Sequence, residues 1–282
     1  MSSGVIKLEL SSVLEERHSL TVFPAVVTEI LRKIDDPDTT PVMFQETIIK
    51  DPLLTAKTLK LANSAFYGYP RAITTISDAV VILGLDTLRN LIIAISAYNV
   101  LNKEVKGYHY EKEDFWKHCL STAMLCRSIA DLYKMPNTET FFVAGILHDI
   151  GKLLLDRYRF SYYNSIIEFS QQYKTPLYLA EKAVLGINHS EVGGGLAEIW
   201  GFPQVLVEVI RRHHEPLSSS PNVLNFAKVT HIADILSNKM LGFFVEKPVS
   251  AVWKEFSITE EKELLSEISE KLNSFMKEIG KE

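Results

Sequence analysis

The sequence is dominated by helical segments with clear boundaries, and this pattern restricts the fold more than any other feature. Asp51 is typical of a helix N-cap because a proline follows it at the first helical position. Thr75 and Gly84 bound the next predicted helix. Apolar residues recur at helical spacing over 111–134, and the sequence contains no strand-like alternation of useful length. The chain is therefore predicted to be all-α.

Later segments continue the helical pattern. Asp86 is expected to begin a helix that runs to about Lys103. Thr138 is interpreted as the cap of a helix that continues without a break to Tyr158, with a front half that is apolar on every side and therefore buried. We predict an N-terminal helical part (1–106), a helical bundle (107–242) and a C-terminal amphipathic helix (243–282), with the seam at 103–110.

Composition excludes several classes of protein. The net charge of −5 and the lack of a Lys/Arg run argue against nucleic acid as a partner. The greasiest stretch, 91–101, is too short to span a bilayer, so no membrane contact is expected. Cys119 and Cys126 would lie about 10 Å apart on one helix, too far for a disulfide. Free thiols and the absence of a signal peptide predict a cytoplasmic protein.

The candidate chemistry centres on His148 and Asp149, which follow an apolar run. A buried carboxylate is usually paired or bound to a metal, because burying it alone is costly. Adjacent residues on a helix diverge by about 100°, so other helices must supply further ligands. The other candidate ligands, in chain order, are His118, His189, His213, His214 and Asp234.

Five histidines and two carboxylates suit Zn, Mn or Fe better than Ca or Mg, and they suffice for two ions. Such ions activate water and polarise phosphoryl oxygens. Asp114, one turn before His118, is expected to face the same cavity. Lys152, one turn beyond His148, is positioned to steer a phosphate. If the chain is an enzyme, Asp149 and Lys152 are its catalytic residues.

Each residue also has a simpler interpretation. A single histidine in a helix is more often hydrogen-bonded than bound to a metal. His213 and His214 would be favourable at a helix C-terminus through the helix dipole alone. Asp234 would be a surface charge with His231 as its partner. The ordered combination of all seven residues favours the metal interpretation.

That order resembles the HD superfamily of metal-dependent phosphohydrolases, especially the HD-GYP branch, whose members hydrolyse cyclic dinucleotides at a two- or three-iron site. The resemblance implies Fe or Mn rather than Zn, metal binding by the seven residues above, and phosphate contact by Lys152. The sequence departs from that branch after His214-Glu215, where it reads PLSSSP instead of a Gly-Tyr-Pro signature.

The N-terminal half resembles the related HDOD family, in LTVFPAVVTEILRKIDDPDTT, IIKDPLLTAKTLKLANSAFYG and TISDAVVILGLDTLRNLIIA, and the likeness covers about 18–215. HDOD domains act mainly as non-enzymatic bacterial signalling modules. Within the second segment, Asn63 and Ser64 are interpreted as the end of a helix that reaches Gly68. Its aromatic residues are expected to pack in the core; they are Phe66, Tyr67 and Tyr69.

Two functional hypotheses follow. The first is an HDOD signalling module that binds a protein partner or a nucleotide and retains a metal. The second is a metal-dependent phosphohydrolase acting on a nucleotide or cyclic dinucleotide. A DNA-binding regulator is disfavoured, because the chain is acidic and Arg89 stands alone in the second helix of the helix–turn–helix-like segment. The oligomeric state is left open.

Overall fold

The computed structural model describes residues 7–19, 25–32, 40–63, 69, 71–256, 258 and 260–279. Within these residues the secondary structure is helical, with one isolated bridge between Val105 and Tyr110 and no strand. The all-α prediction is confirmed.

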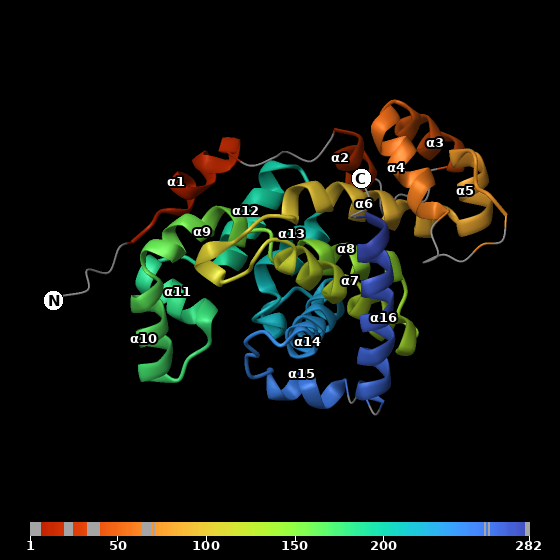
Figure 1. Ribbon diagram of the computed structural model, residues 1–282. Coiled ribbons are helices and arrows are strands. Elements are labelled where there is room, and N and C mark those ends of the chain that lie inside the picture. The colour runs from red at the N-terminus through yellow and green to blue at the C-terminus, as the bar shows by residue number, and fades with distance from the viewer. Residues whose placement is uncertain are drawn as a thin grey trace.

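Helices α2–α5 lie together at one end of the molecule, α6 leads from them into the centre, and α1 lies apart, toward the other end (Figure 1). In chain order these elements are α1 (Leu10–Glu15), η1 (Glu16–Ser19), α2 (Ala25–Arg32), α3 (Pro41–Ile49), α4 (Pro52–Ala62), α5 (Ile76–Leu83) and α6 (Leu85–Leu101).

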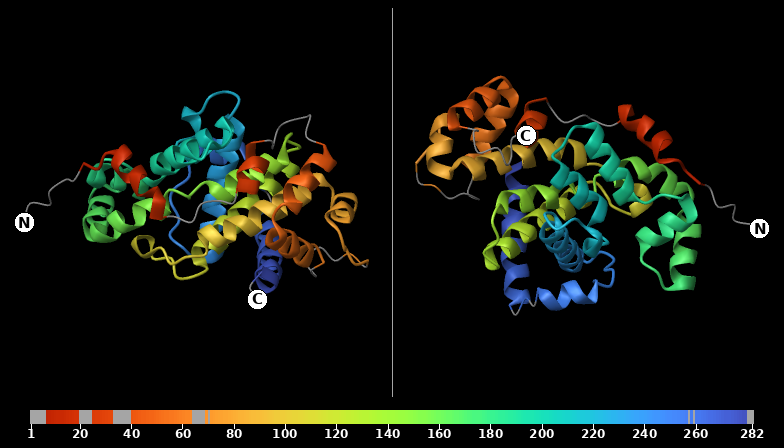
Figure 2. Two further views of the ribbon diagram at one scale, coloured as in Figure 1. Left: turned by 90° about the horizontal axis from the view of Figure 1, so that it is seen from above. Right: turned by 180° about the vertical axis from the view of Figure 1, so that it is seen from behind.

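The remaining helices surround α14, which runs through the middle of this part of the molecule (Figures 1 and 2). They are η2 (Lys106–Tyr108), α7 (Asp114–Leu132), α8 (Thr138–Leu147), α9 (Lys152–Ser161), α10 (Tyr163–Tyr173), α11 (Leu177–Leu185), α12 (His189–Ile199), α13 (Gln204–Arg212), η3 (Pro216–Ser218), α14 (Leu224–Leu241), α15 (Ser250–Glu255) and α16 (Glu261–Ile279).

Helix α7 is the central packing element. It contacts α8 and α14 along most of its length, and α6 and α16 cover further parts of it. Thirteen of its nineteen residues are buried, which matches its apolar pattern on more than one face. The division into 1–106, 107–242 and 243–282 stays a prediction.

The predicted helix boundaries near the N-terminus agree with the structure. Asp51 Oδ1 accepts a hydrogen bond from the Leu54 N–H at 3.0 Å, and Thr75 Oγ1 accepts one from the Asp78 N–H at 3.0 Å. Gly84 ends α5 with a φ of +83°, a conformation that glycine adopts without steric cost.

The Asn63 side chain connects the end of α4 to the backbone of Ile73. Its Nδ2 donates to the Ile73 carbonyl at 2.7 Å, and its Oδ1 accepts from the Ile73 N–H at 2.7 Å. The expectation that Tyr69 packs in the core is wrong, because 48% of this residue is exposed. The predictions for Ser64, Phe66, Tyr67 and Gly68 fall outside the described residues.

The prediction of one continuous helix through His148 and Asp149 is also wrong. Helix α8 ends at Leu147, residues 148–151 form a tight turn, and α9 begins at Lys152. The N-cap of α8 is Asn137, not Thr138.

The close approach of α12 explains this turn. A Cβ on Gly151 would lie 1.9 Å from the His189 carbonyl oxygen and 2.4 Å from the Gly193 nitrogen. Only glycine fits so close to another backbone, so Gly151 allows the turn to pack directly against the first turns of α12.

Among the described residues, no single helix has the length and apolar character needed to cross a membrane. Helices α5 and α6 taken together would be long and apolar enough, but the chain bends by 119° between them. Cys119 and Cys126 are not bonded to each other, as predicted, and both are buried.

Candidate metal centre

The structure brings the seven predicted ligand residues together at the centre of the molecule, all of them buried. They come from five places in the chain. His118 lies on α7, His148 and Asp149 in the turn after α8, His189 at the first position of α12, His213 and His214 directly after α13, and Asp234 on α14.

Four of them form the first donor group: His118, His148, Asp149 and Asp234. His118 Nε2 lies 3.2 Å from His148 Nε2 and 3.3 Å from Asp234 Oδ1. Asp149 Oδ2 lies 3.2 Å from both histidine nitrogens. Ligands held about 2.1 Å from one ion are separated by about 3.0–3.4 Å in octahedral or tetrahedral geometry. The first donor group therefore has the dimensions of a single-ion site.

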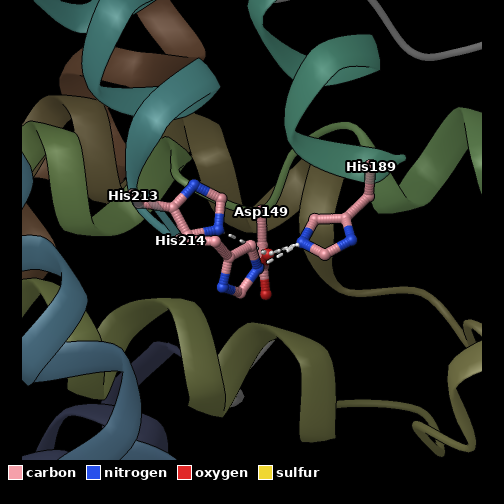
Figure 3. A group of neighbouring side chains, drawn as sticks. All are labelled: Asp149, His189, His213 and His214. Atoms are coloured by element: carbon pink, nitrogen blue, oxygen red, sulfur yellow. Dashed lines mark hydrogen bonds and ion pairs between the residues drawn. The ribbon is translucent and has the colours of Figure 1, made fainter. Parts of the chain in front are cut away.

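The second donor group consists of Asp149, His189, His213 and His214 (Figure 3). His189 Nε2 lies 2.8 Å from His214 Nε2 and 3.3 Å from Asp149 Oδ1. His213 Nε2 lies 3.7 Å from the same carboxylate oxygen. This group matches the first in size but contains three imidazoles and one carboxylate.

Asp149 belongs to both groups through different oxygens. Its Oδ2 faces His118 and His148, and its Oδ1 faces His189 and His213. A carboxylate placed in this way has the geometry to bridge two neighbouring cations, as carboxylates do in two-metal hydrolytic centres.

The histidines are held in the tautomer that a metal ligand requires. The Nδ1–H of His148 donates to the Gly145 carbonyl at 2.8 Å, and that of His213 to the Ile210 carbonyl at 2.7 Å. His189 Nδ1 lies 2.7 Å from Glu181 Oε2. When these rings are neutral, the proton stays on Nδ1, and the Nε2 atoms face the centre with a lone pair that can bind a metal.

Two atoms at the centre have no hydrogen-bond partner. They are Asp149 Oδ1 and His213 Nε2, both of the second donor group and both buried. Buried polar atoms without partners are rare and call for an explanation, such as an ion. The donor chemistry, the spacing and these two unpaired atoms all fit a metal.

The carboxylates shift the pKa values of the first donor group. Burial alone would lower the pKa of His148, but the charge of Asp149 and hydrogen bonds to Asp149 and Asp234 outweigh it and raise this pKa to about 10. Burial opposes ionisation of Asp149, yet His148 and Lys152 hold its pKa well below the usual range. Without a metal, protons and Lys152 therefore compensate the carboxylates.

The second donor group behaves differently. Burial lowers the pKa of His213 to about 3, with a further contribution from the neighbouring His148. Burial likewise holds the pKa of His214 well below its usual range. Both imidazoles are therefore neutral at pH 7, the form that binds metals.

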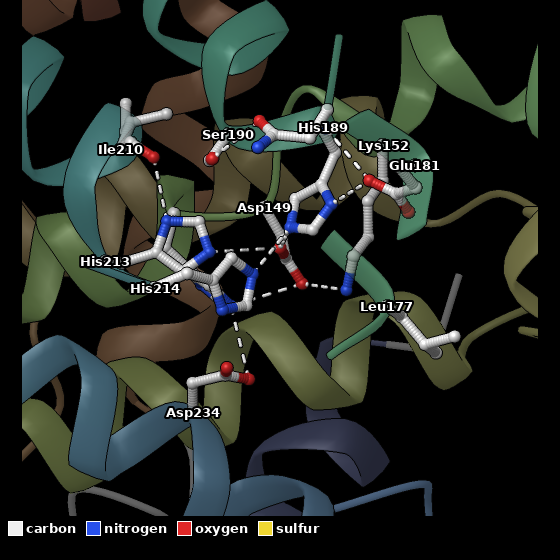
Figure 4. A network of polar contacts seen from close by, with 12 residues as sticks. Asp149, Lys152, Leu177, Glu181, His189, Ser190, Ile210, His213, His214 and Asp234 are labelled. Atoms are coloured by element: carbon white, nitrogen blue, oxygen red, sulfur yellow. Dashed lines mark hydrogen bonds and ion pairs between the residues drawn. The ribbon is translucent and has the colours of Figure 1, made fainter. Parts of the chain in front are cut away.

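Glu181 and Arg159 form a buried ion pair beside His189 that was not predicted from the sequence. Glu181 on α11 accepts a hydrogen bond from His189 N at 3.1 Å (Figure 4). It accepts another from Arg159 Nε at 2.9 Å. Burial raises the pKa of Glu181, but His189 and Arg159 outweigh it and lower this pKa to about 2. A carboxylate behind a ligating histidine orients the ring and raises its basicity.

His231 also has a structural role that was not predicted. It is buried, not part of a surface pair with Asp234. Its Nδ1 lies 2.9 Å from the His213 carbonyl oxygen, and its Nε2 accepts from the Val249 N–H at 3.0 Å. His231 thereby connects the turn that carries His213 to the segment before α15.

Lys152 and Asp114 were both expected near the centre, but only Lys152 lies there. Lys152 Nζ lies 2.5 Å from Asp149 Oδ2, with the ring centroids of Tyr108 and Tyr110 at 5.2 and 5.4 Å. Asp114 belongs to neither donor group, and its Oδ1 lies 3.9 Å from Lys117 Nζ. At the first turn of α7 its side chain reaches solvent, so the expectation for Asp114 is wrong.

A cavity of about 440 Å³ adjoins the centre. Lys152, His189, His214 and Asp234 line it on the side of the donor groups. The other walls combine aliphatic, polar and charged residues with five phenol or phenyl rings, those of Tyr108, Tyr110, Tyr163, Phe243 and Phe244. The volume lies in the range of about 300–1,000 Å³ that is typical of small-molecule sites.

Several solved structures have a fold similar to that of this chain. A "Putative phosphohydrolase" from Shewanella amazonensis SB2B superposes with a TM-score of 0.71 at 26% identity, covering 96% of this chain and 98% of the other. An "HDOD domain protein with unknown function" from Geobacter sulfurreducens gives a TM-score of 0.68 at 26% identity, covering 95% of each chain. A "Putative signal transduction protein" from Marinobacter aquaeolei VT8 is 22% identical, with a TM-score of 0.74 and coverage of 98% and 62%, and shows the fold alone.

Sequence comparison identifies the family. A curated relative from Treponema pallidum (strain Nichols), called "Uncharacterized protein", is 25% identical over 208 residues. These are 72% of this chain but 39% of the relative, so the chain spans about two fifths of that protein's length. Residues 20–216 match the model of the HDOD domain. The chain therefore belongs to the HDOD domain family.

Proposed function

We propose that this HDOD protein carries a two-metal phosphohydrolase centre. The observation that carries the proposal is Asp149, whose two oxygens each complete a separate group of four buried donors. A bridging carboxylate between two such groups is expected where two ions share the work of activating water and stabilising a phosphoryl group.

The donor set supports Fe or Mn more than Zn. Each donor group supplies four protein ligands, which would satisfy tetrahedral zinc and leave no position for water or substrate. An ion with five or six ligands keeps positions for both. When bound, the ions would lower the pKa of a coordinated water and polarise a phosphoryl oxygen.

The residues around the centre support a nucleotide as substrate. Lys152 lies at the boundary between the donor groups and the cavity, where its ammonium group can bind a phosphate oxygen. The aromatic rings on the cavity walls, including those of Tyr110 and Phe243, offer flat surfaces for a base. Tyr178 stacks on His214 with ring centroids 4.5 Å apart and holds that ring at the cavity wall. A nucleotide or a cyclic dinucleotide combines both features.

A second candidate is a cytoplasmic signalling module that binds a protein partner or a nucleotide without turnover. Two observations favour it. Lys152 is bound to Asp149, so the cation expected to hold phosphate already has a partner. The segment after His214 forms the short helix η3, anchored where Glu208 accepts from Ser220 Oγ at 2.9 Å, in place of a Gly-Tyr-Pro loop.

Turnover separates the two candidates. The full chain is loaded with Mn²⁺ or, anaerobically, with Fe²⁺, and incubated with bis(p-nitrophenyl) phosphate, cyclic dinucleotides and nucleoside phosphates. We expect metal-dependent hydrolysis, which Asp149→Asn reduces by about 10³-fold or more because both ions lose their shared ligand. Asp114→Asn makes the same chemical change outside the donor groups and should keep full activity.

The folded state of each variant is checked by circular dichroism and thermal unfolding. Metal-loaded protein that hydrolyses none of these compounds, yet binds a nucleotide, would favour the signalling module. Wild-type protein that folds normally and takes up no metal would exclude both the metal centre and the enzyme.

A further inference from the structure

The segment that joins α14 to α15, residues 242–249, forms one wall of the cavity beside the centre. Two of its phenylalanines and its one carboxylate, Glu246, line that cavity. The far end of the segment is anchored, because the Val249 N–H donates to His231 Nε2 at 3.0 Å. Glu246 has no part in either donor group, and the function proposed above does not use it.

Glu246 is held in position by one of its two carboxylate oxygens. Its Oε1 accepts a hydrogen bond from the Leu177 N–H at 2.9 Å. Leu177 is the first residue of α11, so this N–H has no partner within its own helix, and the positive end of the helix dipole favours a carboxylate there. This bond fixes the carboxylate and with it the place of the second oxygen.

The second oxygen, Oε2, is available to a ligand. It accepts no hydrogen bond from any described residue, and it is not among the fully enclosed polar atoms that lack a partner. The side chain is 20% exposed and lines the cavity. His214 Nδ1 lies 3.6 Å from this oxygen, beyond hydrogen-bond distance. Glu246 therefore presents an open acceptor close to the second donor group.

The charged residues of the cavity come from different walls. Lys152 and Arg159, both on α9, are its lysine and arginine residues within the described part of the chain. Glu246 comes from the wall that follows α14 and would repel a phosphate group. A ligand that suits this cavity has an anionic group for the donor groups and Lys152, and a hydrogen-bond donor for Glu246.

The order of groups in a nucleotide decides which of them faces Glu246. The sugar lies between the phosphate and the base. Glu246 adjoins His214, a residue of the centre where the phosphoryl group is expected to bind, so the sugar lies nearer to it than the base does. The hydroxyl groups of ribose are hydrogen-bond donors, and a carboxylate binds them in dinucleotide sites of other folds. The exposed ring of Phe244 remains for the base.

We propose that Glu246 Oε2 accepts a hydrogen bond from a ribose hydroxyl group of the nucleotide and thereby distinguishes nucleotides by the hydroxyl groups of their sugar. This role rests on the nucleotide proposed above as the ligand. It does not depend on hydrolysis, so it holds for both candidate functions.

Nucleotides that differ in one hydroxyl group test this role. The probes are adenosine and guanosine 5′-monophosphates with their 2′-deoxy and 3′-deoxy forms, added to the full metal-loaded chain in competition with a fluorescent nucleotide analogue. Where a probe is hydrolysed, kcat/KM replaces the dissociation constant. We expect loss of one of the two hydroxyl groups to weaken binding about tenfold or more, the usual effect of a hydrogen bond to a charged acceptor.

Two variants of Glu246 remove the open acceptor. Glu246→Gln keeps an oxygen for the Leu177 N–H and replaces the carboxylate oxygen that faces the ligand with an amide group. Glu246→Ala removes both oxygens and serves as the second variant. In each, the hydroxyl and deoxy forms should bind within about threefold of each other. Glu198→Gln makes the same change as the first variant at the exposed end of α12 and should keep the wild-type preference.

The outcomes distinguish this role from the proposed function. If the Glu246 variants weaken the hydroxyl and deoxy forms equally, Glu246 is only structural, and the proposal is overturned while the metal centre and its nucleotide stand. Equal affinity of the wild-type protein for all forms, or loss of a metal ion from Glu246→Gln in elemental analysis, would also overturn it. If none of the nucleotides binds to the metal-loaded wild type, the nucleotide itself is wrong, and the role of Glu246 falls with it.

Discussion

The two donor groups share Asp149 but differ in charge and in the protonation of their histidines. The first donor group has two carboxylates, and these raise the pKa of His148 to about 10. The second donor group has only the shared carboxylate, and burial keeps His213 neutral with a pKa of about 3. The first group attracts a cation more strongly but must release a proton, whereas the second is ready to bind at neutral pH.

The largest expected effect comes from the shared residue. Asp149→Asn should reduce the metal content of the purified protein from about two ions per chain to almost none, because both groups lose an anionic ligand. Elemental analysis by mass spectrometry measures the stoichiometry, with Asp114→Asn as the control. If one full ion per chain persists in Asp149→Asn, Asp149 does not bridge the two groups.

Replacing a residue that belongs to only one donor group should remove one ion and leave the other bound. Asp234→Asn is expected to cost the ion of the first donor group, and His213→Ala that of the second, leaving about one ion per chain in each variant. The same elemental analysis, after dialysis against a weak chelator, measures this. Loss of both ions from either variant would mean that the two sites form only together.

The next effect comes from the residue behind His189. Glu181→Gln should weaken metal binding at the second donor group by about 10- to 100-fold, because the ring loses the carboxylate that orients it. Competition with a chelating dye measures the affinity, in an Asp234→Asn background that retains the second group alone. Glu198→Gln, at the exposed C-terminal end of α12, is the matched control. An equal affinity for the Glu181 and Glu198 variants would contradict a role for Glu181 in orienting His189.

The smallest expected effect is on pH dependence. Below a pKa of about 10, His148 must lose a proton when a metal binds, so raising the pH by one unit should increase the affinity of the first donor group about tenfold. His213, with a pKa of about 3, is already neutral, so the affinity of the second group should change little between pH 6 and 8.

Two variants allow the pH dependence of metal affinity to be measured for each donor group separately. His213→Ala retains the first donor group and Asp234→Asn the second. Chelator competition at three pH values in this range gives each dependence. An equal change of metal affinity with pH in the two variants would contradict the proposed difference in protonation.

Sequence reasoning identified the residues of the centre but not how the chain assembles it. Histidine and aspartate are conspicuous among apolar neighbours, and their order along the chain was informative. The structure shows that all seven meet, and that they bind a metal remains a prediction. The tight turn at 148–151 was missed because it depends on the backbone of α12, more than thirty residues further along the chain, approaching Gly151.

Supporting residues were harder to predict than ligands. In the sequence, Glu181 stands in LYLAEKAVLG, where it resembles any glutamate on a surface helix. Only the approach of Arg159 and His189 in three dimensions shows it to be buried and bonded. Asp114 shows the opposite error, since helical spacing from His118 placed it on the correct face but could not show that the first turn of α7 reaches solvent.

Helix α7 reaches both the centre and the C-terminal helix. His118 belongs to the first donor group, while Leu120 and Met124 line one cavity with Ile268 and Phe275 of α16. One helix of nineteen residues therefore carries both a candidate ligand and part of the surface on which α16 packs. If a displacement of α16 moved α7, it would change metal affinity, and thermodynamic linkage would then require the metal to favour one position of α16.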